Sequence, residues 1–109
     1  MNAEPLDVLV QRTQKGDKQA FVELLVGVQK EVRVFLSAHA SSVDMVEEVL
    51  QATFVACFES IHKYEPRGTF LPWLKGMARN LLVKELKERS RYASVEGHVL
   101  EEMLVLTDA

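Results

Sequence analysis

The sequence predicts an all-α protein, a compact bundle of three to four helices with a short C-terminal helical tail. Three observations support this fold class: apolar residues recur at helical spacing, no strand-like alternation persists, and Pro, Gly or capping residues separate the periodic segments. With 109 residues, 48% of them hydrophobic, the chain is long enough for one hydrophobic core. We expect one helical domain over residues 1–91 and an acidic linker or tail over residues 92–109.

Two helices are predicted in the first third of the chain. Pro5 suits the first turn of a short helix, which Lys15-Gly16 should end, and its inward residues are Leu6, Leu9 and Val10. Asp17 is a favourable N-cap for a longer second helix that ends at His39-Ala40. The buried stripe expected for the second helix consists of Phe21, Leu24, Leu25, Val28, Val32, Phe35 and Leu36.

A third helix is predicted after Ser41, which forms a capping-box pattern with Asp44. Its expected buried stripe consists of Val43, Val46, Leu50, Phe54, Cys57 and Ile61. Four other residues follow the i, i+4, i+7, i+11 pattern and should share one exposed surface: Asp44, Glu48, Gln51 and Val55.

A fourth helix is predicted from the N-cap Thr69 to Arg91, after a loop over Lys63–Gly68. Its core ridge should consist of Phe70, Leu74, Met77 and Leu81. Gly76 lies inside this helix at a cost of roughly 1 kcal/mol against Ala, which suggests close helix packing or a bend. Beyond Gly97 we expect a short amphipathic helix carrying Val99, Leu100, Met103, Leu104 and Leu106.

The charge changes sign along the chain although the total is only −3. Residues 1–66 carry six Lys/Arg and ten Asp/Glu, whereas residues 67–91 carry seven basic and two acidic residues. Residues 92–109 carry four acidic residues and no Lys or Arg. A basic segment within an otherwise acidic chain points to a polyanionic partner such as nucleic acid.

The basic residues of the fourth helix fall on one stripe with an aromatic residue and an amide. At 100° per residue the stripe consists of Trp73, Asn80, Lys84, Lys87 and Arg91. Cations bind phosphates, flat rings stack on unpaired bases and amides read base edges, so the stripe suits melted DNA, with Tyr64 and His62 nearby. The same pattern also fits a core Trp73 followed by cations that favour a helix C-terminus, and composition alone does not separate the two.

The sequence gives little support for an enzyme. The three histidines His39, His62 and His98 lack metal-ligand spacing, Cys57 falls on the buried stripe, and no Gly-rich phosphate loop is present. We therefore expect no catalytic site, metal or cofactor. A single cysteine and the lack of a signal-peptide pattern or a bilayer-spanning apolar run favour the cytoplasm.

Two sequence blocks resemble region two of bacterial sigma factors of the extracytoplasmic-function group. The third helix contains EEVLQATF over residues 47–54, close to the Glu-Asp-Leu-Val-Gln-Glu-Thr-Phe pattern of that family. The family then has Gly-[Ser/Thr]-Phe, Trp-Leu and Ala-Arg-Asn, which here are residues 68–70, 73–74 and 78–80. Gly16-Asp17, Ala20-Phe21 and Leu24-Leu25 also resemble the first family helices, so the likeness covers about residues 6–91.

The resemblance implies two binding surfaces. The third helix would dock on the coiled coil of the largest subunit of core RNA polymerase through Asp44, Glu47, Glu48 and Gln51. The preceding loop and the fourth helix would open the minus-ten promoter element and read its non-template strand, from which one base is flipped out. The residues implied for this DNA contact are Lys63, Tyr64, Phe70, Trp73, Arg79, Asn80, Lys84, Lys87 and Arg91. The resemblance also allows an anti-sigma factor as a partner. It implies no contact with a membrane.

The chain departs from the family pattern at three points. Ala52 replaces the usual acid, which would weaken the polymerase contact, and Lys84 stands where Asp is common. Nothing after Arg91 resembles the second family domain, a helix-turn-helix that reads the minus-thirty-five element. Either this domain was excised, which is the interpretation that we favour, or it is truly absent. The acidic tail resembles an inter-domain linker.

Two other functions stay open. A helical interaction module, for instance an adaptor or an anti-sigma-like protein, would use the same helices without DNA affinity. A duplex-binding helix-turn-helix regulator is the weakest alternative, because Lys63–Gly68 is long for its turn and the fourth helix starts with apolar residues.

Overall fold

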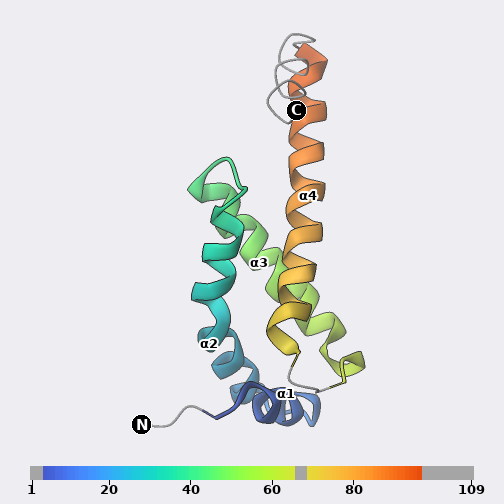
Figure 1. The fold of residues 1–109 in the computed structure, drawn as a ribbon. Helices are drawn as coiled ribbons and strands as arrows, with labels where there is room; N and C mark the ends of the chain where they lie inside the picture. Colours follow the sequence, from blue (N-terminus) through green and yellow to red (C-terminus); the bar gives the residue numbers. More distant parts are fainter. Residues whose placement is uncertain (1–3, 66–68, 97–109) are drawn as a thin grey trace.

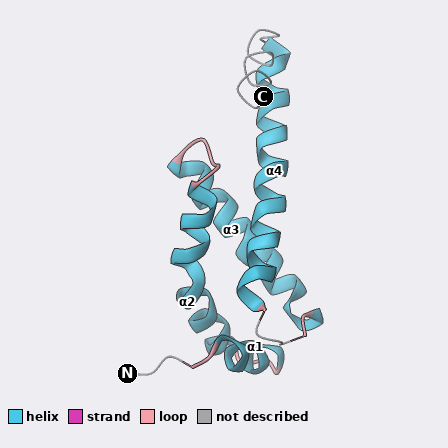
Figure 2. Ribbon diagram, viewed as in Figure 1, coloured by secondary structure: helices cyan, strands magenta, loops and turns pink. Residues whose placement is uncertain are grey.

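The computed structural model describes residues 4–65 and 69–96, with side chains described up to residue 91. The elements in chain order are α1 (Leu6–Gln14), α2 (Lys18–Ser37), α3 (Val43–Ser60), the short 3-10 helix η1 (Ile61–Lys63) and α4 (Phe70–Glu96). Within these ranges no residue forms a strand (Figure 2). The predicted all-α class is therefore confirmed.

The helices form a bundle in which α1 lies across one end (Figure 1). α2 packs against α1, α3 and α4, and α3 packs against α4. The C-terminal end of α4 projects beyond the other helices (Figure 1).

The junction between α1 and α2 follows the predicted local signals. Gly16 has a φ of +98°, a conformation that residues with a Cβ rarely adopt, and this turn separates the two helices. The Asp17 carboxylate then caps α2 by accepting a 3.1 Å hydrogen bond from the backbone N–H of Ala20. Arg12 of α1 donates to the same carboxylate from Nε at 3.0 Å and from Nη2 at 2.7 Å, so the turn is held from both sides.

The predicted stripe of α2 is confirmed in its centre. Four residues of that stripe are buried, namely Leu24, Val28, Val32 and Leu36. Ala20, which the predicted stripe did not include, is buried as well. Phe21, Leu25 and Phe35 flank that line and are only half-buried. The helix ends at Ser37, two residues before the predicted end.

The start of α3 differs from the prediction by one residue. Ser42, not Ser41, is the N-cap, and its hydroxyl accepts a 3.1 Å hydrogen bond from the backbone N–H of Met45. Val43 is therefore the first helical residue, and its side chain is 77% exposed rather than buried. Met45 and Val49 lie in the core instead, and Phe54 is half-buried. Val46, Leu50, Cys57 and Ile61 are buried as predicted.

The fourth helix begins as predicted but is longer. The carbonyl of Thr69 accepts a 3.0 Å hydrogen bond from the N–H of Trp73, and the helix continues to Glu96, five residues beyond the expected end at Arg91. Its buried line consists of Phe70, Leu74, Ala78 and Leu82. Met77 and Leu81, predicted for the core ridge, are half-buried.

Gly76 does not have the packing role that we expected. A Cβ at this position would meet no atom within 4 Å outside its own helix, and the residue is exposed. Close helix packing therefore does not account for a glycine here. The predicted helix beyond Gly97 lies outside the described residues, and no described helix is both long and apolar enough to cross a membrane.

Candidate nucleic-acid interface

Three aromatic side chains meet where η1 leads into α4. We call Tyr64, Phe70 and Trp73 the aromatic cluster. The ring centroids of Tyr64 and Trp73 are 4.8 Å apart at an interplanar angle of 36°, and Phe70 lies 5.8 Å from each of them. Phe70 is buried, so its ring supports the cluster from the core, whereas Tyr64 and Trp73 are half-buried and keep part of their surface in solvent.

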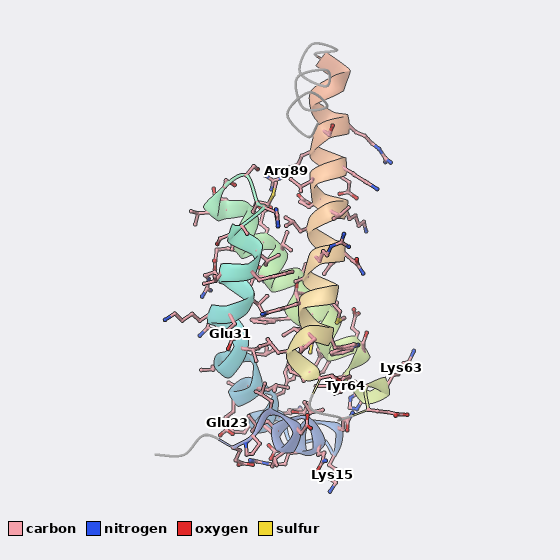
Figure 3. The ribbon with its side chains drawn as sticks, viewed as in Figure 1. Lys15, Glu23, Glu31, Lys63, Tyr64 and Arg89 are labelled. Carbon is pink, nitrogen blue, oxygen red and sulfur yellow. The ribbon has the colours of Figure 1, made fainter. Side chains whose placement is uncertain are left out.

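Hydrogen bonds hold Tyr64 at its hydroxyl and at its backbone. The hydroxyl is 2.9 Å from Thr69 Oγ1, and the Tyr64 N–H donates to the carbonyl of Ile61 at 3.2 Å. Lys63, the last residue of η1, comes directly before Tyr64 and has an exposed side chain. Figure 3 shows Lys63 and Tyr64 at the α1 end of the bundle, far from Arg89.

A second group lies nearer the C-terminal end of α4. We call this group, which surrounds a hollow of about 360 Å³, the cationic hollow; it consists of Asn80, Val83, Lys84, Lys87, Glu88 and Arg91. Asn80, Lys84, Lys87 and Arg91 were all predicted for one stripe, and the structure brings these four together. Trp73 does not line the hollow and belongs to the aromatic cluster instead.

Arg79 belongs to neither group. It is exposed, and it follows Lys75 by four residues, so both lie on the same side of α4. The Lys75 ammonium lies 5.8 Å from the ring centroid of Phe35 of α2. Arg79 therefore lies on the side of α4 that carries Lys75 and does not line the cationic hollow.

The residues predicted to bind a protein lie together on α3. We call Asp44, Glu47, Glu48 and Gln51 the acidic face, and all four side chains are exposed. Glu47 accepts hydrogen bonds from Arg33 of α2 at 2.7 and 3.1 Å, and these bonds lower the pKa of the Glu47 carboxyl. Glu48 Oε2 accepts a 2.6 Å hydrogen bond from Arg89 Nη2, and Arg89 also binds Glu85 at 3.1 Å.

The acidic face and the cationic hollow are joined by a groove between α3 and α4. Its volume is about 190 Å³, and it is lined by Glu48, Val49, Ala52, Leu81, Lys84, Glu85 and Glu88. Lys84 and Glu88 also line the cationic hollow. Ala52 and Lys84, two of the departures from the family pattern, thus line the same groove. A carboxylate at position 52 would have lain close to Lys84.

Sequence reasoning missed three residues that shape these surfaces. Arg89 was counted only as part of the basic segment, and no local pattern relates it to Glu48, 41 residues away. Gln14 of α1 hydrogen-bonds to the backbone near the aromatic cluster, again without a sequence signal. Phe58 is 57% exposed and extends the line of Asp44, Glu48, Gln51 and Val55 by three residues, a spacing that the sequence does contain.

The cysteine and histidine side chains of the described residues are not arranged as a nucleophilic or metal-binding site. Cys57 is buried, and burial raises the pKa of its thiol to about 12, so it is a poor nucleophile at neutral pH. His39 and His62 are exposed, and His98 lies outside the described residues. Across residues 4–65 and 69–96, no three His, Cys, Asp or Glu side chains are grouped so that they could hold a metal ion.

Comparisons with known proteins place the chain in a family. The model of the family Sigma-70 region 2 matches residues 25–92. Among curated proteins, the chain is 32% identical over 90 residues to RNA polymerase sigma factor CarQ of Myxococcus xanthus, covering 80% of this chain and 52% of CarQ. It is 33% identical over 84 residues to the ECF RNA polymerase sigma-E factor of Escherichia coli K12, covering 77% and 44% of the two chains. The chain thus spans about half the length of these relatives.

A solved structure agrees in fold as well as in sequence. An engineered region 2 of sigmaE, determined by NMR in complex with GTAAAA, superposes with a TM-score of 0.77 at 31% identity. The match covers 84% of this chain and 97% of the other. The sequence blocks, the helical bundle and these matches agree, and the chain belongs to the Sigma-70 region 2 family.

Proposed function

We propose that this domain binds core RNA polymerase through the acidic face of α3 and recognises and melts the minus-ten promoter element with the aromatic cluster and α4. One observation carries the proposal: a structure of a relative with the same fold at 31% identity is a complex with the oligonucleotide GTAAAA. The implied partners are core polymerase, with the coiled coil of its largest subunit as docking site, and the non-template strand of promoter DNA. The domain acts as an initiation factor and not as an enzyme.

The aromatic cluster supports the melting step. Removing a base from the duplex stack costs a few kcal/mol, and stacking of a base on an aromatic side chain returns about 1–3 kcal/mol. Tyr64 and Trp73 have the partly exposed ring surfaces that such stacking needs, and buried Phe70 keeps them in place. Their position at the N-terminal end of α4 brings the unpaired base next to the loop that precedes the helix.

The cationic hollow supports the contact with the rest of the element. Asn80 carries a side-chain amide that can donate to and accept from an adenine edge. Lys84 and Lys87 are exposed in the same hollow and bind phosphates without reading sequence. Lys63 adds a cation near the flipped base, and Arg79 adds one on the side of α4 that carries Lys75.

The acidic face supports a contact with a basic partner surface. Asp44, Glu48 and Gln51 project from one side of α3, and Val55 and Phe58 continue that side as exposed apolar residues. The loss of an acid at Ala52 reduces the charge of this face, and we expect weaker binding than in relatives with Glu there. An anti-sigma factor that covers the same surfaces would block both contacts.

A binding assay with core RNA polymerase tests the protein contact. We expect the wild type to be retained by immobilised core enzyme, and Glu48→Lys and Gln51→Ala to be retained less. Glu59→Gln, which removes an exposed carboxylate near the C-terminal end of α3, is the matched control. A wild type that fails to bind core enzyme contradicts the proposal.

Binding to single-stranded oligonucleotides tests the DNA contact. GTAAAA and its single-base variants are the probes, and we expect Asn80→Ala to lower the preference among them while Lys84→Ala lowers affinity for all of them. Lys18→Ala, an exposed cation at the start of α2, is the control. If the domain binds neither core enzyme nor DNA, the helical interaction module becomes the better explanation.

A further inference from the structure

The side chain of Gln14, the last residue of α1, is hydrogen-bonded to the backbone that carries the aromatic cluster. Its Nε2 donates to the carbonyl of Ile61 at 2.7 Å and to the carbonyl of Tyr64 at 2.6 Å. Only the nitrogen end of the amide can donate, so the two carbonyls define its orientation. These bonds join residues that are 47 and 50 positions apart in the chain.

The two accepting carbonyls bracket η1, which sets the direction of Tyr64. The N–H of Tyr64 closes the turn on Ile61 at 3.2 Å, so Gln14 and Tyr64 share that carbonyl. The Tyr64 ring then lies 4.8 Å from Trp73, and its hydroxyl bonds to Thr69 at the start of α4. A shift of the Tyr64 carbonyl therefore moves the ring against Trp73.

The helix that holds Gln14 is itself firmly placed. Leu9 and Val10 of α1 are buried in the core, and Arg12 is bonded to the N-cap Asp17 of α2. The side chain of Gln14 is half-buried between α1 and η1. A donor on a rigid helix can hold a neighbouring turn in one conformation, because moving the turn breaks two hydrogen bonds at once.

We propose that Gln14 is a positioning residue for DNA recognition: its amide holds Tyr64 and thereby sets the ring surfaces of Tyr64 and Trp73 on which an unpaired base stacks. The inference rests on the proposed function, because the position of the two rings matters only if an unpaired base stacks on them. It gives α1 a part in the selection of the base. The resemblance had left this helix without a role. Gln14 touches neither DNA nor polymerase in this scheme and acts only through Tyr64.

Substitutions of Gln14 that differ in donor and length test the inference. Gln14→Met keeps the length of the side chain and removes both donors, Gln14→Asn keeps the amide but shortens it, and Gln14→Lys restores a donor at similar reach. Gln11→Met makes the same chemical change at an exposed position of α1 and serves as control. Circular dichroism establishes that each variant is folded.

Two readouts separate positioning from general stability. Trp73 is the only tryptophan of the chain, so its emission spectrum reports the cluster directly. We expect altered Trp73 emission in Gln14→Met and Gln14→Asn, and a loss of about threefold to tenfold in discrimination between GTAAAA and its single-base variants. Gln14→Lys should recover both properties, and binding to core polymerase should stay at the wild-type level in all variants.

The outcomes distinguish this inference from the proposed function. If wild type discriminates among the oligonucleotides and folded Gln14→Met or Gln14→Asn discriminates equally well, the positioning role is wrong although the proposed function stands. Altered emission without lost discrimination also overturns it. If the wild type binds no oligonucleotide, the proposed function fails first. Should Gln14→Met not fold, Gln14→Asn and Gln14→Lys decide the question by the same readouts.

Discussion

Arg89 of α4 donates a 2.6 Å hydrogen bond to Glu48 of α3, which joins the helix proposed to bind DNA to the helix proposed to bind polymerase. Both side chains are solvent-accessible, at 42% and 61% exposure, so water and salt screen the pair. A polymerase surface that takes Glu48 would have to displace Arg89. The displaced guanidinium would keep Glu85 as a partner, 3.1 Å away on its own helix.

The Glu48–Arg89 pair yields a prediction for the polymerase contact. Arg89→Ala should bind core enzyme as well as the wild type or up to about fivefold more tightly, because an exposed ion pair competes only weakly. Glu48→Lys should lose binding whether or not Arg89 is present. Titration of labelled core enzyme with each variant measures both effects. A loss of affinity in Arg89→Ala would mean that Arg89 itself contacts the partner.

Lys87 should contribute to DNA affinity through phosphate alone. Each phosphate contact with a single strand lowers the slope of log K against log salt by about 0.7. We therefore expect Lys87→Ala to bind all oligonucleotides more weakly and with a shallower salt dependence by about that amount. Fluorescence anisotropy at several salt concentrations gives the slope. Lys18→Ala should leave it unchanged, and an unaltered slope in Lys87→Ala would remove this residue from the DNA contact.

Gly76→Ala should stabilise the domain. The position is exposed inside α4, a Cβ would meet no atom within 4 Å, and Ala is favoured over Gly in a helix by about 1 kcal/mol. Urea unfolding should show a gain of roughly this size. Gly27→Ala in α2, which is equally open, should give a similar gain, whereas Gly16→Ala should destabilise because its φ is +98°. A gain at Gly27 but none at Gly76 would point to strain in α4.

The capping carboxylate of α2 should make stability fall in acid. Hydrogen bonds from Arg12, and then from the backbone N–H of Ala20, lower the pKa of Asp17 below its ordinary value near 4. Because the folded pKa is the lower one, the stabilisation is complete above the unfolded pKa and is lost as pH falls through the folded pKa. Hydrogen bonds from Arg33 likewise lower the pKa of Glu47, so protonation of Glu47 also reduces the stability of the fold as the pH falls.

Thermal unfolding from pH 7 down to about pH 2 measures this dependence. Asp17→Asn should melt at a lower temperature than the wild type at pH 7 and should lose less stability on acidification, since part of the titrating stabilisation is gone. Glu59→Gln is the control. Parallel pH profiles for wild type and Asp17→Asn would contradict a role of Asp17 in the acid response.

Local signals were sufficient for most of the helices. The Gly16-Asp17 turn, the apolar stripe of α2 and the start of α4 were predictable, because caps and periodicity act within a few residues of the backbone that they stabilise. The first residue of α3 was missed because Ser41 and Ser42 have similar capping propensities. Val43, the first helical residue, is exposed, and Met45 is buried.

The sequence by itself determined the helices, the basic segment, and the four residues of the cationic hollow that share one face of α4, since these follow from spacing along a single helix. Only the tertiary structure decided that the rings of Phe70 and Trp73 lie 5.8 Å apart, that Lys75 lies over the Phe35 ring of α2 and that Glu48 is paired with Arg89. It also decided that Gln14 holds the turn before α4. These contacts join helices through side chains up to 50 residues apart, and their geometry depends on how the core packs, which no local pattern encodes.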